Sequence, residues 1–287
     1  MDSQTTPVPT LSIIMTTYRD RRERLYRSVE SILGQTFEDF EFIVVFEPDD
    51  PNFHQLRQSC ADERLITIQN PQKLGRCACY NRALDIARGR YIARMDSDDW
   101  AVPERFELQL AFLRRNPEIG VVGSTVILVD DEDREVGRRE VPLTHEGIMR
   151  YLVFTNPIVH PTVIWDTERV GRGLHFDPKF SAYCDDLELW LRIAGQRVRF
   201  ANMQEPLLRY RQPHQYCRPR ENWRYNFLAR CRHWRLGLAR PSFWAGILGL
   251  GILSILPPAL INALTRRSSL SDRFRAIQPA KQVSKEI

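Results

Sequence analysis

The chain has few cysteines, and no two of them are spaced as in a zinc site. Six cysteines are spread over 287 residues, and the closest two, Cys77 and Cys79, are separated by a single residue. Structural zinc sites usually contain CxxC-like pairs, and disulfide-stabilised secreted domains have a much denser cysteine framework. We therefore expect a reducing compartment and thiols that mainly fill space in the core.

The sequence also lacks the segments that mark secretion or P-loop nucleotide hydrolysis. Residues 1–10 are polar, contain two prolines and show neither a basic start nor an apolar run. We therefore expect no signal peptide, a disordered segment at residues 1–9 and a cytoplasmic catalytic part. No GxxxxGK[ST] sequence occurs, which excludes a P-loop NTPase.

The composition is that of a globular protein with a basic bias. Hydrophobic residues make up 43% and charged residues 27%, so a sizeable core is available. The net charge of +5 suits phosphorylated substrates, acidic lipid headgroups or nucleic acid, without choosing among them. A group of arginines lies late in the chain, at positions 218, 220, 224, 230, 232, 235 and 240.

Strand-like and helix-like segments alternate in the first hundred residues. Strands are expected at residues 11–16, 40–46, 65–69 and 91–95, and helices at 21–33 and 80–87. This alternation predicts an α/β fold with a parallel sheet. Ligands of such sheets bind beyond the carboxyl ends of the strands, so functional side chains are expected there.

After Trp100 the expected strands and helices no longer alternate regularly. The sequence predicts helices at 103–115, 144–154 and 185–194, and strands at 121–129, 135–140, 162–165, 198–201 and 207–211.

An acidic cluster comes directly after the strand expected at 91–95. Asp96, Asp98 and Asp99 lie within four residues of one another, and such close like charges resist joint ionisation without a cation. Mg²⁺ and Mn²⁺ prefer oxygen ligands and are held by a few carboxylates together with substrate phosphates. The D-x-D spacing alone is a weak signal because solvated acidic turns are common. Its place after an apolar strand favours a metal-bound diphosphate.

Several motifs in order resemble those of family-2 glycosyltransferases over residues 10–215. The matching segments are residues 11–18, 41–47, 70–83, 96–99, 156–163, 184–192 and 210–214. The resemblance implies the GT-A fold, which is a Rossmann-like mixed and mostly parallel sheet flanked by helices. We therefore expect a GT-A domain at residues 10–217.

The resemblance also implies a reaction and a site. The expected enzyme is an inverting, metal-dependent transferase that moves a sugar from a nucleoside-diphosphate donor, expected to carry uridine, to a saccharide or lipid-linked saccharide in surface polysaccharide synthesis. Asp186 is the implied general base, and His160 and Asp185 are implied acceptor contacts. The implied donor contacts are Thr16, Tyr18, Glu47, Asp96, Asp98 and Arg211. The implied ligands of Mn²⁺ or Mg²⁺ are Asp98, Asp99 and His214.

This sequence departs from the family pattern in places. Phe46 and Glu47 stand where the family usually has two aspartates, Arg19 replaces a common asparagine, and the step from Arg211 to His214 is one residue longer. Glu47 still offers an acceptor for uracil N3–H.

Structural interpretations stay open for several of these residues. Asp185 and Asp186 could instead be an N-cap pair for the following helix, where their charge also suits the helix dipole. His160 also suits a packed turn, Arg211 an ion pair with a structural carboxylate, and Glu47 a solvated loop.

Three alternatives to an active transferase remain. Phe46 and Arg19 would fit a catalytically degenerate, membrane-bound scaffold, against which the intact Asp96, Asp98 and Asp186 argue. A nucleotidyltransferase would be expected to carry a glycine-rich loop after the first strand, where residues 17–20 contain no glycine. No nucleic-acid-binding module accompanies the late arginines, so we expect no nucleic-acid partner.

The C-terminal part, residues 218–287, is basic and then apolar. Residues 243–264 are almost wholly apolar, interrupted by Pro257 and Pro258 and followed by Arg266 and Arg267. The apolar run before the prolines is shorter than the roughly 20 residues of a simple membrane span. We expect an apolar helical tail that associates with the cytoplasmic face of the inner membrane, peripherally or as an anchor. A buried helical hairpin is the alternative.

Overall fold

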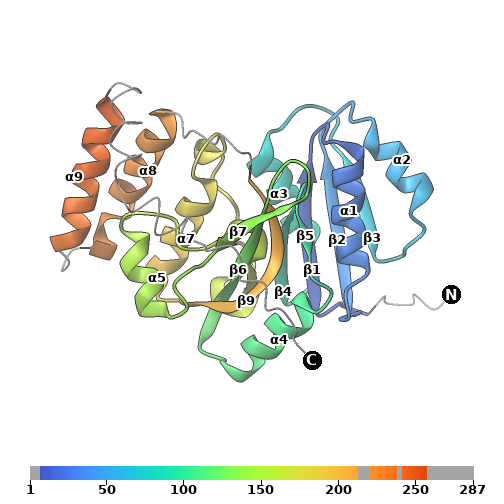
Figure 1. Cartoon of the computed structure of the whole chain (residues 1–287), viewed down its shortest axis with the longest axis horizontal. Coiled ribbons are helices and arrows are strands. Elements are labelled where there is room, and N and C mark those ends of the chain that lie inside the picture. Colours follow the sequence, from blue (N-terminus) through green and yellow to red (C-terminus); the bar gives the residue numbers. More distant parts are fainter. Residues whose placement is uncertain (1–6, 213–219, 238–240, 257–287) are drawn as a thin grey trace, which may run out of the picture.

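The computed structural model describes residues 7–212, 220–237 and 241–256. Its strands form one mixed sheet in the order β3-β2-β1-β4-β8-β6-β9-β5, with β7 beside β6 (Figure 1). The strands are β1 (Leu11–Thr17), β2 (Phe40–Phe46), β3 (Leu65–Gln69), β4 (Tyr91–Asp96), β5 (Trp100–Ala101), β6 (Ile119–Val129), β7 (Glu135–Arg139), β8 (Ile164–Asp166) and β9 (Arg199–Arg211).

Helices cover both faces of this sheet. The longer helices are α1 (Arg22–Leu33), α2 (Asn52–Ser59), α3 (Arg76–Ile86), α4 (Arg105–Arg115), α5 (His145–Leu152) and α7 (Asp185–Gly195). Alternate residues of β1 point to opposite faces of the sheet. Ile13 and Met15 pack in a cluster with α1, α2 and α4, whereas Ile14 packs in a cluster with α3 and α7. Because β1 is buried on both faces, its sequence is mainly apolar, with Ile13, Ile14 and Met15 in succession, and this made the strand predictable.

The strands β1, β2, β3 and β4 pair in parallel, as predicted. Antiparallel pairing of β8 with β4 and β6 makes the sheet mixed. The prediction of two separate strands at 198–201 and 207–211 is wrong, because β9 runs through both. Pro206 interrupted the pattern, but it lies where the β6–β9 register shifts, and such irregular positions tolerate proline.

Two helices differ from the prediction near the site. Helix α3 begins at Arg76, four residues before the expected start, directly after Gly75 with φ of 84°. Glycine adopts this conformation without a steric penalty. Helix α2 was not predicted, because its eight residues contain only two strongly apolar side chains, Phe53 and Leu56.

Helices α8 (Arg220–Arg232) and α9 (Pro241–Ile255) lie at one end of the molecule, beside α5 and α7 (Figure 1). On α8, Arg230 is buried and Arg232 pairs with Asp177, so these two arginines serve contacts within the protein. The sequence of α9 contains no charged residue. Within the described ranges, no helix combines the length and the apolarity needed to cross a membrane. Residues 257–264 of the predicted membrane segment, His214 and residues 1–6 lie outside the described residues.

Candidate active site

A cleft of about 310 Å³ opens beyond the carboxyl ends of β1, β2 and β4. Its position agrees with the rule for ligands of parallel sheets. The side chains that line it come from these three strand ends and from the start of α3. They are Thr16, Thr17, Tyr18, Asp20, Glu47, Lys73, Gly75, Arg76, Cys79, Tyr80, Asp96 and Ser97. Four of the six predicted donor contacts are among them: Thr16, Tyr18, Glu47 and Asp96.

Glu47 lies at the wall of the cleft and holds the loop that precedes α3. The residue is 4% exposed, and its carboxylate accepts hydrogen bonds from the backbone N–H of Gly75 (2.6 Å) and Leu74 (3.0 Å) and from Asn70 Nδ2 (3.2 Å). Burial acts to raise the pKa of Glu47, but these hydrogen bonds outweigh it and lower the pKa below the ordinary value. The observed contacts of Glu47 are therefore with the loop, and the predicted uracil contact stays a prediction.

Tyr18 stands at the mouth of the cleft with an exposed ring. Lys73 Nζ lies 4.4 Å from the ring centroid, and the Arg19 guanidinium lies 5.5 Å from it. An exposed aromatic face with cations beside it suits a planar base attached to phosphates.

Asp20 and Asp96 line the cleft, and the carboxylate of Asp98 lies near enough to interact with both. Asp20 Oδ2 accepts hydrogen bonds from Ser97 Oγ (2.5 Å) and Thr17 Oγ1 (2.8 Å), and Asp96 Oδ1 pairs with Arg94 Nη2 (2.7 Å). Burial and the charges of Asp96 and Asp20 raise the pKa of Asp98 to about 6. The charge of Arg211 acts in the opposite direction on Asp98, but it does not offset the other causes.

Asp99 and Arg211 are buried behind the cleft. Asp99 Oδ1 accepts a hydrogen bond from the backbone N–H of Arg211 (2.7 Å), and burial raises the pKa of Asp99 well above its ordinary value. The Arg211 guanidinium donates to the carbonyl of Asp130 (2.7 Å) and pairs with Asp133. These contacts fasten β9 to the acidic strand end. They favour Asp98 over Asp99 as a metal ligand and give Arg211 structural partners.

Asp186 is half-buried in the first turn of α7, whose N-cap position is occupied by Cys184 rather than by Asp185 or Asp186. Asp186 Oδ2 accepts a hydrogen bond from Asn156 Nδ2 (2.5 Å), and its Oδ1 accepts one from the backbone N–H of Leu187 (2.7 Å). Both oxygens are thus oriented by the protein while each keeps a further lone pair.

Asp185 connects the start of α7 to the cleft. Asp185 Oδ1 pairs with Arg76 Nη2 (2.7 Å), and Arg76 lines the cleft. Burial raises the pKa of Asp185 to about 6, although Arg76 acts in the opposite direction. Its other oxygen, Oδ2, is buried and has no hydrogen-bond partner among the described residues.

His160 is buried among aromatic rings. Its ring centroid lies 5.5 Å from that of Phe176 and 5.6 Å from that of Trp190. Burial lowers the pKa of His160 well below its ordinary value, so the imidazole is neutral at neutral pH. Its Nε2 has no hydrogen-bond partner among the described residues. The surroundings are those of a packed histidine, and the predicted acceptor contact stays a prediction.

The acidic cluster fits a divalent cation that shares its ligands with a substrate. No group of three or more His, Cys, Asp or Glu side chains in the described part of the chain is arranged as a complete metal site. Mg²⁺ and Mn²⁺ need only one or two carboxylates when phosphates and water supply the other oxygens. Burial is the main cause of the raised pKa of Asp98, and the negative charges of Asp96 and Asp20 add to it; a bound cation would act against both. Asp96 and Asp98 are therefore the residues that would hold the cation.

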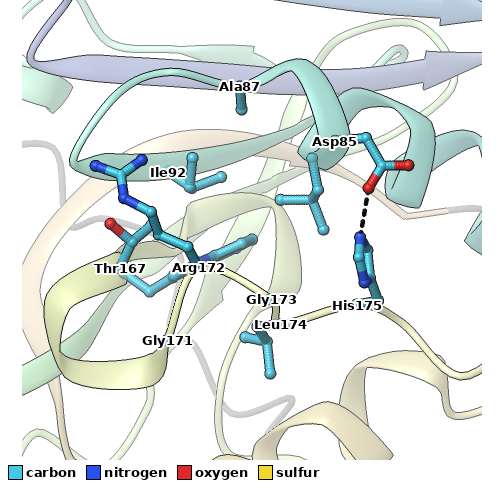
Figure 2. Close-up of a pocket in the computed structure, with 11 residues that line it drawn as sticks. Asp85, Ala87, Ile92, Thr167, Gly171, Arg172, Gly173, Leu174 and His175 are labelled. Atoms are coloured by element: carbon cyan, nitrogen blue, oxygen red, sulfur yellow. Dashed lines mark hydrogen bonds and ion pairs between the residues drawn. The ribbon is translucent and has the colours of Figure 1, made fainter.

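A second cavity, of about 380 Å³, lies apart from these strand ends (Figure 2). It is formed by the end of α3, Ile92, Trp165 and the loop at 171–175. Figure 2 shows Asp85 and His175 facing each other across one side, where a hydrogen bond of 2.8 Å joins them. Its lining includes none of the predicted site residues, so the cleft is the stronger candidate.

Sequence reasoning missed several polar residues of the site. Asp20, Lys73 and Arg76 line the cleft, and Asn156 contacts the predicted base. Asp20 had a detectable signal, since it lies shortly after the first strand. Arg76 had none, because its role depends on Asp185, which is more than a hundred residues away in sequence.

The comparisons with known proteins agree with this geometry. The model of the glycosyl transferase family 2 matches residues 12–165, which is more than half of the chain. The chain belongs to glycosyltransferase family 2. This finding confirms the family that the motifs predicted, and it establishes a transferase with a glycosyltransferase role.

Similar glycosyltransferases come from archaea and bacteria. An uncharacterised glycosyltransferase of Methanocaldococcus jannaschii is 32% identical over 79% of this chain and 80% of its own length. The amylovoran biosynthesis glycosyltransferase AmsE of Erwinia amylovora is 27% identical over 75% of this chain and 80% of its own. The UDP-Glc:alpha-D-GlcNAc-diphosphoundecaprenol beta-1,3-glucosyltransferase WfaP of Escherichia coli is 28% identical over 67% of this chain and 73% of its own.

Among solved structures, S. aureus TarS in complex with UDP-GlcNAc superposes with a TM-score of 0.61. The match covers 77% of this chain and 66% of the TarS chain at 18% identity. At this identity the likeness concerns the fold, and it confirms the GT-A architecture.

The contacts of Glu47 predict a pH-dependent loss of stability in the variant Glu47→Gln. A neutral amide cannot replace the charged acceptor of three hydrogen bonds, so we expect a loss of about 1–3 kcal/mol in the free energy of unfolding at pH 7. The pKa of Glu47 is lower in the folded protein than its ordinary 4.5. The difference in unfolding free energy between wild type and the variant should therefore be fully present above pH 4.5. It should shrink as the pH falls through the lower pKa that Glu47 has in the folded protein.

Urea unfolding at a series of pH values measures this difference. The exposed Glu118→Gln is the matched control, and it should change stability by less than about 0.5 kcal/mol. An equal effect of the two variants at pH 7 would contradict the anchoring role of Glu47.

Proposed function

We propose that this family-2 glycosyltransferase transfers a sugar from a UDP-sugar to a saccharide or lipid-linked saccharide with inversion at the anomeric carbon. The observation that carries the proposal is the bridge between Arg76 and Asp185. Arg76 lines the cleft that contains Tyr18 and Asp96, and Asp185 is adjacent to Asp186. Groups suited to a nucleotide diphosphate and a carboxylate suited to act as a base thus belong to one site.

The donor would lie along the cleft. Tyr18 would stack on the base, Thr16 and Asp96 would contact the nucleoside, and Lys73 and Arg76 would add positive charge near the phosphates. The bound UDP-GlcNAc of TarS supports a nucleotide sugar as the donor here. Glu47 would act by holding the loop that carries Lys73 and Arg76.

Asp186 would remove the proton of the acceptor hydroxyl. The acceptor oxygen then forms its bond to the anomeric carbon as the bond to the nucleoside diphosphate breaks on the opposite face. A single displacement of this kind needs one base, whereas retaining hydrolysis uses a second carboxylate as nucleophile. Asn156 and the N–H of Leu187 would keep the carboxylate of Asp186 in place.

A Mn²⁺ or Mg²⁺ ion held by Asp98 and Asp96 would neutralise charge on the departing diphosphate. His214 and Asp99 remain the other ligands that the family resemblance implies. His214 lies outside the described residues, and Asp99 is buried behind the cleft.

The departure from the family pattern at Phe46 is compatible with activity. Phe46 is fully buried and packs edge-on against Phe53, with ring centroids 5.4 Å apart. It therefore contributes to the core rather than to the cleft, which argues against a degenerate scaffold.

A lipid-linked acceptor at the cytoplasmic face of the inner membrane is supported by the exposed surface of α9. Trp244, Leu248 and Ile252 recur every four residues along one side of this helix and are exposed. Arg235, in the preceding turn, is exposed as well and suits anionic headgroups. The diphosphoundecaprenol in the name of WfaP is an acceptor of this lipid-linked kind.

A donor screen tests the function. Purified full-length protein would be incubated with UDP-, GDP- and TDP-sugars and Mn²⁺, with and without EDTA, and release of the nucleoside diphosphate would be followed. We expect release from one UDP-sugar and its loss in EDTA, because the acidic cluster needs a counterion to bind a diphosphate. Release from no nucleotide sugar would contradict the transferase proposal, and release that persists in EDTA would contradict the metal.

Removing the base should separate binding from transfer. In Asp186→Asn the amide cannot accept the proton, so we expect transfer to fall by at least about a hundredfold, with UDP affinity within about twofold of wild type. Calorimetry with UDP and initial rates of transfer measure the two quantities. Near wild-type transfer by this variant would overturn the assignment of Asp186.

The apolar side of α9 predicts binding to lipid. In Leu248→Glu a charge replaces a leucine that is 67% exposed, and we expect about a tenfold loss of binding to vesicles of anionic phospholipid. Leu108→Glu, at an exposed leucine of α4, is the matched control and should bind as wild type does. Cosedimentation measures the bound fraction, and equal binding of the two variants would contradict a membrane role of α9.

A further inference from the structure

Helix α8 supplies hydrogen-bond donors to the C-terminal end of α5. The last carbonyls of a helix have no partners within it and need donors from elsewhere. Arg230 on α8 is 0% exposed, and its Nε donates to the carbonyls of Val153 (2.6 Å) and Leu152 (3.2 Å). Its Nη2 donates to the carbonyl of Thr155 (3.1 Å). A cation at this end also has a favourable interaction with the helix dipole.

These carbonyls belong to the segment that positions Asn156. Thr155 is the neighbour of Asn156, and the side chain of Asn156 donates the 2.5 Å hydrogen bond to Asp186. The path from Arg230 to Asp186 therefore runs through a short stretch of backbone and one amide. The planar guanidinium reaches three carbonyls at once, which a lysine ammonium on a flexible stem cannot do in the same geometry.

The same helix also contacts the other segment that meets at Asp186. Cys184, two residues before Asp186, has a φ of 65°, a conformation that is uncommon for a residue with a side chain. Asn226 Nδ2 donates to Cys184 Sγ (2.7 Å). Asn226 Oδ1 accepts a hydrogen bond from Arg230 Nη1 (3.0 Å), so the two contacts of α8 are joined.

We propose that Arg230 is a positioning residue of the glycosyl transfer, acting with Asn226 to hold the two segments that bring Asn156 and Cys184 to Asp186. The inference rests on the proposed function, in which Asp186 is the base. The inference gives α8 a part in catalysis, although this helix lies beyond the residues that the family model matches.

Arg230→Lys tests the proposal, with Arg224→Lys as the matched control. Arg224 lies on the same helix, is exposed and undergoes the same change. We expect Arg230→Lys to lower kcat at least about tenfold with the UDP-sugar that gives transfer in wild type, because small misplacements of a reacting group are costly. The KM for that donor and the affinity for UDP should stay within about twofold. Arg224→Lys should change none of these quantities.

A double mutant separates positioning from general damage. If Arg230 acts through Asn156, then Asn156→Ala should lower kcat similarly, and adding Arg230→Lys to it should cost less than about twofold more. The proposal would be overturned if the kcat of the double mutant fell by the product of the two single losses. A loss of UDP affinity that parallels the loss of kcat would also overturn it. If Arg230→Lys does not fold, Asn226→Ala is measured in the same way, since it removes the contact to Cys184 and keeps the arginine.

The two proposals fail differently. A wild-type enzyme that transfers sugar, with Arg230→Lys as active as Arg224→Lys, overturns only the role of Arg230. A wild-type protein that releases UDP from no sugar nucleotide refutes the proposed function itself.

Discussion

The site depends on guanidinium groups buried beneath a cluster of carboxylates. Arg94 on β4 is almost fully buried, pairs with Asp96 (2.7 Å) and donates to the hydroxyl of Tyr80 (2.7 Å). Burial acts to lower the pKa of Arg94, but Asp96 and Tyr80 outweigh it and raise the pKa. Arg105 on α4 donates to the carbonyl of Arg94 (3.0 Å), and burial lowers its pKa to about 9. Arg94 thus pairs the charge of Asp96 at the edge of the core, where an unpaired buried charge would cost several kcal/mol, and Arg105 holds the backbone of Arg94.

The parallel half of the fold was predictable because its signals are local. Strands β1 and β2 are buried on both faces and are mainly apolar in sequence, and α1 shows its apolar residues at helical spacing. The start of α3 was not predictable in this way. The start of α3 depends on Glu47, which is distant in sequence and accepts hydrogen bonds from the backbone N–H groups of Leu74 and Gly75. Strand β9 likewise continues past Pro206 because it is paired with β6 along its length.

The residues of the candidate site also fall into those that local sequence predicted and those that only the tertiary structure places. Thr16, Tyr18 and Asp96 lie at or directly after the carboxyl end of a predicted strand, which made them predictable, and all three line the cleft. The partners of the proposed reacting groups come from distant segments, as Arg76 does for Asp185 and Asn156 does for Asp186. A motif gives the identity of a reacting group, while the hydrogen bonds that hold it depend on the tertiary structure.

The arrangement of α8 and α9 joins the proposed membrane contact to the proposed chemistry. Helix α9 packs closely on this end of the protein: an added Cβ at Gly251 would lie 3.2 Å from Phe227 of α8, and one at Gly246 would lie 3.0 Å from Phe154, just after α5. The segment after α5 is the one that Arg230 holds and that leads to Asn156. In the proposed function, a lipid surface bound to the outer side of α9 would therefore be separated by one helix from the elements that orient Asp186. On the same proposal, a lipid-linked acceptor would arrive at the end of the molecule that holds Asp186.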